Sequence, residues 1–149
     1  MKPIKILLIA LACAAIFSGP VLCAELLSVR TSAVNVRSGP GTRYPAQWKA
    51  WKFTPLLVLE RKGAWVHVRD FENVRGWVSA GTLVKTPTVT VKSAAARVRA
   101  APKASSEVLW EVDREYSFKV LGKRKGWVHV SDDEGTEGWI AASLLWGAI

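Results

Sequence analysis

The tetrapeptide Trp65-Val66-His67-Val68 decides the fold, because it returns 62 positions later as Trp127-Val128-His129-Val130. The same offset aligns residues 29–83 with the end of the chain without a gap. The other matching landmarks are Val36-Arg37 and Val98-Arg99, Pro40 and Pro102, Trp48 and Trp110, Leu59 and Leu121, Gly76-Trp77 and Gly138-Trp139, and Leu83 and Leu145. Agreement of so many landmarks at one offset indicates a tandem duplication and predicts two similar units.

The first 24 residues have the composition of a secretory signal peptide. Lys2 and Lys5 precede an apolar run from Ile6 to Phe17. The small residue Ala24 comes directly before Glu25. A positive start, a short apolar core and a small-residue exit are typical of export signals. The run is shorter than the roughly 20 apolar residues that span a membrane. We predict cleavage after Ala24, with an uncleaved N-terminal anchor as the alternative.

Both cysteines, Cys13 and Cys23, fall inside this segment. The exported chain would therefore have no disulfide and no thiol nucleophile. A lipid attached to Cys23 is a further alternative, although Leu22 stands where a lipoprotein signal has a small residue. We expect the protein in the periplasm, the cell envelope or the exterior, and in contact with the membrane only through the signal peptide before cleavage.

The rest of the chain divides into two predicted domains, residues 25–86 and 87–149. Units of this size bury only about 60% of their unfolded surface. Because no disulfide is present, we expect the eight tryptophans to supply much of the core. The net charge is +9, and loss of Lys2 and Lys5 with the signal peptide leaves +7. This charge favours anionic partners such as cell-wall polymers or lipid head groups, unless the basic residues only form a solvated surface.

Short strands with frequent turns predict an all-β fold of two small barrels. Val66 and Val68 should share one face of a strand, and Trp65 and His67 the other. The second repeat places Lys119 between Phe118 and Val120, so the equivalent residues Leu56 and Val58 should point inward. Residues 79–83 suggest a single helical turn before a last strand, whereas residues 44–51 look irregular. The short linker, residues 85–88, should keep the barrels close together.

The first unit contains the segment Val34-Asn35-Val36-Arg37-Ser38-Gly39-Pro40-Gly41-Thr42, then Gly76-Trp77-Val78, and closes with Leu83. With these motifs it resembles the bacterial SH3-like (SH3b) domain. The second unit resembles it less closely, because Arg99-Ala100-Ala101-Pro102-Lys103 lacks both glycines. The resemblance implies barrels of five or six strands, an extracytoplasmic location and a binding or targeting role on peptidoglycan, often beside a catalytic domain.

The residues outside the signal peptide do not suggest an enzyme. His67 and His129 occupy the same place in each repeat and should stack beside Trp65 and Trp127. Asp70 follows its strand end, and no cysteine is left for a histidine to activate as a general base. One histidine per barrel is too few ligands for a metal ion, and a phosphate-binding glycine loop is missing. We therefore expect no catalytic residues, no metal and no cofactor.

The candidate ligand site is a shallow groove on the first barrel. A turn at Arg37, Ser38 and Gly39 should approach the aromatic residues Tyr44, Trp48 and Trp65. Arg37 could pair with a peptide carboxylate or with a neighbouring acid of the chain, and both interpretations stay open. Trp48 and Trp77 recur in both repeats, which favours the core for them, whereas Tyr44 should be exposed. The intact glycine turn favours the first barrel as the binding one.

Two functions follow for an exported non-catalytic module. The first is docking on peptidoglycan or on cell-wall peptides. The alternative is a scaffold whose barrels bind another envelope protein. Charge and aromatic residues would also suit a nucleic acid, but export argues against that partner.

Overall fold

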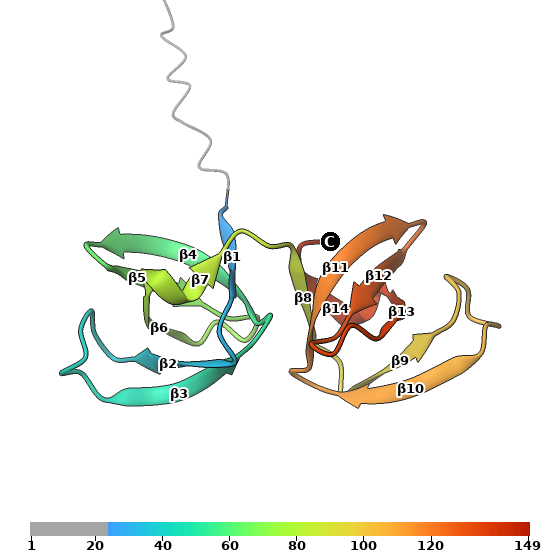
Figure 1. Ribbon diagram of the computed structural model, residues 1–149, viewed down its shortest axis with the longest axis horizontal. Helices are drawn as coiled ribbons and strands as arrows, with labels where there is room; N and C mark the ends of the chain where they lie inside the picture. The colour runs from blue at the N-terminus through green and yellow to red at the C-terminus, as the bar shows by residue number, and fades with distance from the viewer. Residues whose placement is uncertain (1–23) are drawn as a thin grey trace, which may run out of the picture.

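The computed structural model describes residues 24–149, so the predicted signal peptide up to Cys23 lies outside it. The described chain forms two seven-stranded antiparallel sheets, one for each repeat, each bent into a small barrel (Figure 1). This confirms the all-β prediction. No helix in the described part is long and apolar enough to cross a membrane.

The first barrel has the strand order β3-β2-β6-β5-β4-β1-β7. A 3₁₀ turn at Ala80–Thr82 leads into β7, as predicted. The strands are β1 (Leu26–Val29), β2 (Ala33–Arg37), β3 (Ala46–Trp51), β4 (Pro55–Lys62), β5 (Trp65–Arg69), β6 (Arg75–Ser79) and β7 (Leu83–Val84).

The second barrel repeats this topology, in the order β10-β9-β13-β12-β11-β8-β14. Its 3₁₀ turn is Ala142–Leu144. The strands are β8 (Thr88–Val91), β9 (Ala95–Arg99), β10 (Val108–Asp113), β11 (Ser117–Arg124), β12 (Trp127–Ser131), β13 (Glu137–Ala141) and β14 (Leu145–Gly147).

Two expectations about the strands were wrong. Each sheet has seven strands rather than five or six, and in the first sheet β1 pairs with both β4 and β7. The segment expected to be irregular contains β3, which pairs with β2. A shift in register between Val36 and Arg37 leaves Gln47 unmatched. This bulge interrupts the alternation of inward and outward residues, which is the signal that reveals a strand in a sequence.

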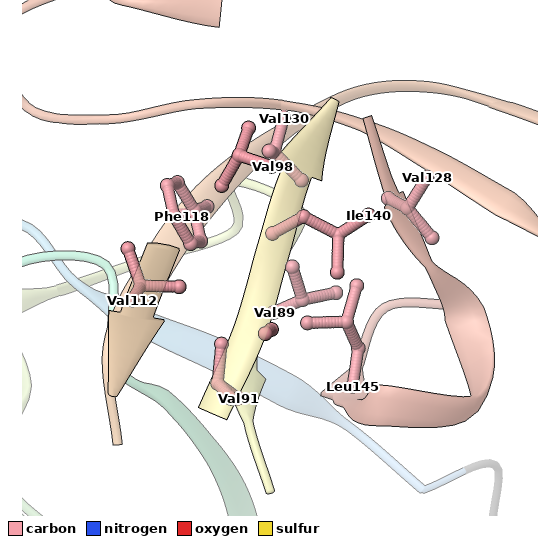
Figure 2. Packing of buried hydrophobic residues seen from close by; sticks show 10 residues of the cluster. Val89, Val91, Val98, Val112, Phe118, Val128, Val130, Ile140 and Leu145 are labelled. Carbon is pink, nitrogen blue, oxygen red and sulfur yellow. The ribbon is translucent and has the colours of Figure 1, made fainter. Parts of the chain in front are cut away.

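Each core is built from aliphatic residues that alternate along the strands. Val66 and Val68 are buried, as is Leu56, while Val58 packs at the edge of the same cluster. Figure 2 shows the corresponding side chains of the second barrel converging from several strands. They are Val89, Val91, Val98, Val112, Phe118, Val128, Val130, Ile140 and Leu145. The predicted orientation of these strands is therefore confirmed.

The tryptophans do not form the core, contrary to expectation. None of the eight is buried, because each barrel interior is already filled by valine-rich strands. Trp48 packs against the first core cluster, as predicted. Trp77 does not, because its neighbours Gly76 and Val78 point inward and leave its indole on the outer face of β6.

The two barrels contact each other through reciprocal ion pairs. Lys52, in the turn after β3, pairs with Asp133 in the loop between β12 and β13. Arg114, the equivalent of Lys52, pairs with Glu72 in the corresponding loop of the first barrel. The guanidinium of Arg114 also lies 4.8 Å from the ring centroid of Phe71. The barrels therefore sit side by side, as the short linker predicted (Figure 1).

Candidate functional site

Four of the six predicted site residues meet at the end of β2 and in the loop between β2 and β3. The Nη1 atom of Arg37 donates to the backbone oxygens of Tyr44 at 2.8 Å and Thr42 at 3.3 Å. A Cβ atom on Gly39 would lie 2.5 Å from the Tyr44 ring, so only glycine lets the ring pack there. The side chain of Ser38 remains exposed at the same turn. Arg37 thus holds the loop through backbone carbonyl groups. Neither a ligand carboxylate nor an acidic side chain of the protein, the two partners expected for Arg37, takes part in these contacts.

Tyr44 is half-buried rather than exposed, because its ring covers Gly39. Arg43 also lies over the ring, with its guanidinium carbon 5.1 Å from the ring centroid. The ring therefore belongs to the scaffold of the loop, with only part of its surface free for a ligand.

The other two predicted residues lie elsewhere. Trp48 packs on the core, and its indole Nε1 is buried without a hydrogen-bond partner in the described chain. Trp65 begins β5 and is half-buried. Its equivalent in the second barrel, Trp127, lines a cleft that the sequence analysis did not identify.

This cleft lies on the second barrel and has a volume of about 480 Å³. Its wall is mostly apolar, and three charged residues stand among its lining residues. The apolar residues are Ala95, Ala96, Ala104, Trp127, Ala141 and Leu144, and the charged residues are Arg97, Arg99 and Glu111. An apolar hollow with a few polar groups is the usual form of a small-ligand site.

The charged side chains of the cleft have defined partners. Arg97 Nε lies 3.4 Å from Glu111 Oε2, and both side chains are exposed. Arg99 Nη1 donates to the backbone oxygen of Ser106 at 2.9 Å, as Arg37 does in the first barrel. An arginine carries five N–H donors, so these contacts leave guanidinium donors that can bind a ligand carboxylate.

The first repeat differs at the positions that form this cleft. Val34, Thr42 and Lys49 stand where the second repeat has Ala96, Ala104 and Glu111. Ala96 and Ala104 are smaller than their counterparts, whereas Arg97 and Leu144 of the same lining are larger than theirs, Asn35 and Thr82. These differences between the repeats are the sequence signal that could have indicated the cleft, whereas the glycine turn indicated the first barrel.

Each histidine stacks on a tryptophan of the neighbouring strand. His67 stacks on Trp77, at 4.7 Å between ring centroids, rather than on Trp65. The expectation was wrong because Trp65 precedes His67 on one strand, whereas Trp77 lies directly opposite it on β6. The carboxylate of Asp70 accepts the backbone N–H groups of Glu72 and Val74 and so shapes its own loop. Within the same range, no group of three or more metal-ligating side chains could hold a metal ion.

Comparison with known proteins gives one consistent assignment for both barrels. Two family models, each described as a bacterial SH3 domain, match residues 32–84 and residues 92–147. Together the two matches cover most of the described chain and correspond to the two sheets.

A curated relative is the putative N-acetylmuramoyl-L-alanine amidase YrvJ of Bacillus subtilis (strain 168). It is 28% identical in an alignment of 128 positions, which covers 78% of this chain and 24% of that protein. The chain thus spans about a quarter of the length of this relative.

Two solved structures are also similar. One is an NlpC/P60 family protein from Bacillus cereus ATCC 10987, with a TM-score of 0.40 and 16% identity over 83% of this chain and 56% of that chain. The other is NlpC2 from Trichomonas vaginalis, with a TM-score of 0.38 and 15% identity over 83% of this chain and 48% of that chain.

Proposed function

Because the chain belongs to the bacterial SH3 domain family, of which it carries two tandem copies, we propose that it is an exported, non-catalytic binding module for peptidoglycan peptides. The relative from Bacillus subtilis supports a cell-wall ligand, since its name describes an enzyme that acts on muramoyl-alanine. The signal-like N-terminus and the basic charge support export and an anionic polymer as the partner.

The cleft of the second barrel is the observation that carries this proposal. It offers the indole of Trp127 and several alanine methyl groups as an apolar surface, with arginines beside them. A short peptide would place its backbone and small side chains against this surface. Its carboxylate would bind the free donors of Arg97 or Arg99, in the manner of other arginine–carboxylate pairs.

The first barrel is a second candidate surface for the same ligand. Its loop at Arg37, Ser38 and Gly39 stays ordered through contacts with Tyr44, and Ser38 remains exposed. Substitutions can distinguish the two surfaces, because only those in the barrel that binds should reduce retention on the cell wall.

The test is co-sedimentation of residues 24–149 with purified peptidoglycan sacculi. Trp127→Ala removes the one aromatic side chain of the cleft lining, and Trp65→Ala is its matched control at the equivalent position of the first barrel. A double variant, Arg37→Ala with Tyr44→Ala, tests the loop of the first barrel. Thermal unfolding of each variant shows whether the barrels remain folded.

We expect Trp127→Ala to lose retention while Trp65→Ala keeps it. Loss only in the Arg37→Ala and Tyr44→Ala double variant would move the site to the first barrel. If the unmodified protein stays in the supernatant at low salt, peptidoglycan is not the ligand. Pull-down of one reproducible envelope protein would then favour the scaffold function instead.

A further inference from the structure

A second hollow lies between the two barrels, apart from the cleft described above. It has a volume of about 400 Å³ and is lined from both sides. Its lining residues are Ser32, Trp51, Lys52 and Phe53 of the first barrel and Arg114, Glu115, Tyr116, Ser117 and Asp133 of the second. A smaller hollow of about 80 Å³ shares Trp51 and Glu115 with it. These two residues therefore lie where the hollows meet.

Two aromatic side chains present unusually free surfaces here. Trp51 is 63% exposed, more than any other large hydrophobic residue of the described chain, and Tyr116 is 44% exposed. Aromatic rings provide a large apolar surface together with an electron-rich face. Such faces attract organic cations, and ammonium groups above all.

The cations that line the hollow already have partners. Lys52 pairs with Asp133, and Arg114 Nε lies 3.2 Å from the carboxylate of Glu72. The carboxylate of Glu115, by contrast, has no ion-pair partner within residues 24–149. The free charge of the hollow is therefore negative, although the protein as a whole is basic.

The acidic loop between β12 and β13 adds to this field. Burial raises the pKa of the Tyr116 phenol, and the nearby carboxylates of Asp132, Glu134 and Asp133 raise it further. A phenol that responds to three carboxylates lies in a region of negative potential. A positively charged ligand group would be attracted to the same region.

The backbone holds lining residues in a conformation that their side chains do not favour. Phe53 has a φ of 67° and Glu115 a φ of 75°, and the two occupy equivalent turns of the repeats. Glycine, asparagine and aspartate are the residues that commonly adopt this left-handed region. Strain of this kind persists where the surrounding structure fixes the residue, and it is common at ligand sites.

We propose that the hollow between the barrels binds a primary ammonium group carried on a peptide side chain of the lysine type. The ammonium lies against the carboxylate of Glu115 and over the faces of Trp51 and Tyr116. The reciprocal ion pairs between the barrels hold the two halves of the site together before the ligand arrives. This site does not depend on the peptide cleft of the second barrel, and each can be tested without the other.

The probe is Nα-acetyl-lysine methylamide, titrated into isotope-labelled residues 24–149. The reporter is the indole N–H signal of Trp51 in the nuclear magnetic resonance spectrum, assigned from its loss in Trp51→Phe. We expect a saturable shift that weakens as salt is added, because salt screens attraction at an exposed carboxylate. The matched control compound is acetylated on Nε as well, which removes the charge, and it should give no saturable shift.

Variants then test the role of the carboxylate. Glu115→Gln keeps the shape of the side chain and should weaken binding roughly fivefold, the scale of an exposed ion pair. Glu107→Gln, at an exposed position in the loop between β9 and β10, should have no effect. Trp51→Ala, also at an exposed position, should weaken binding as well. Because this variant lacks the indole reporter, binding of the probe is followed through the signals of Tyr116.

Three results would overturn the proposal. The first is equal binding of the neutral compound, and the second is the absence of a saturable shift at tens of millimolar probe. The third is unchanged affinity in both Glu115→Gln and Trp51→Ala. Thermal unfolding distinguishes these results from a loss of fold.

Discussion

The imidazole of His129 lies flat on the indole of Trp139, with the ring centroids 4.6 Å apart and the planes inclined by 10°. The two residues are directly opposite each other on β12 and β13, where side chains of neighbouring strands approach closely. His67 and Trp77 repeat this stack in the first barrel. The two histidines have different acidic neighbours. Nε2 of His129 lies 3.1 Å from Glu137 on β13, whereas Nδ1 of His67 lies 3.9 Å from Glu60 on β4.

This stack should stabilise the outer face of the second barrel. In a double-mutant cycle, His129→Ala and Trp139→Ala should show a coupling energy of about 0.5–1.5 kcal/mol, as aromatic pairs do. The control cycle combines His129→Ala with Trp127→Ala, because Trp127 precedes His129 on the same strand and does not stack on it. Urea unfolding measures both cycles. Equal coupling in the two cycles would show that the stack adds nothing beyond burial.

Gly138 is required by the close approach of β13 to β9. A Cβ atom there would lie 2.3 Å from Cγ1 of Val98 and 3.2 Å from the backbone oxygen of Arg99. We expect Gly138→Ala to lower the free energy of unfolding by about 1–3 kcal/mol, the cost of overpacking a core. Gly122→Ala is the control, since its Cβ would meet nothing within 4 Å. Similar losses in the two variants, measured by denaturant unfolding, would contradict this explanation.

The ion pair between Arg114 and Glu72 should help to fix the relative orientation of the barrels. Arg114→Glu places two carboxylates together and also removes the cation from Phe71. An exposed pair contributes about 0.2–1 kcal/mol, so each barrel should stay folded while the interface loosens. Residual dipolar couplings should then fit a separate alignment for each barrel. Adding Glu72→Arg should restore a common alignment, and failure to do so would assign the effect to the other contacts of Arg114, with Phe71 and with the backbone oxygen of Lys92.

The sequence predicted the barrels well because their cores depend on local alternation. The repeated Trp-Val-His-Val segment correctly placed Val66, Val68 and their equivalents inside. It could not place Trp77, because the stack with His67 depends on which strand becomes its neighbour. The strand β3 was missed for a related reason, since the bulge at Gln47 breaks the alternation.

The candidate site was harder to predict than the fold. Arg37, Ser38, Gly39 and Tyr44 do meet in one loop, because they are close in sequence. The cleft of the second barrel instead combines β9, β10, β12 and β13 with Ala104 of a loop and Leu144 of the 3₁₀ turn. Its lining therefore brings together side chains from segments that are distant in sequence. No single motif carries that information.

Filling the cleft should weaken ligand retention without disturbing the core. Ala104 is exposed on its loop and lines the cleft, so Ala104→Phe would place a ring into the space that a peptide needs. We expect binding to sacculi to weaken by about tenfold or more, which corresponds to about 1.4 kcal/mol. Thr42→Phe is the matched control at the equivalent position of the first barrel. If Thr42→Phe reduced retention and Ala104→Phe did not, the first barrel would hold the ligand.

Tyr116 should make the stability of the protein depend on alkaline pH. Burial, and then the carboxylates of Asp132, Glu134 and Asp133, raise the pKa of this phenol above its ordinary value. The folded chain therefore holds the phenolic proton more tightly than the unfolded chain, whose tyrosine pKa is about 10. The resulting stabilisation is complete below about pH 10 and is lost as the pH rises through the folded pKa. Urea unfolding at about pH 9 and about pH 11 should show a steeper loss of stability in the unmodified protein than in Tyr116→Phe. Identical slopes in the two proteins would show that Tyr116 ionises equally easily in the folded and unfolded chains.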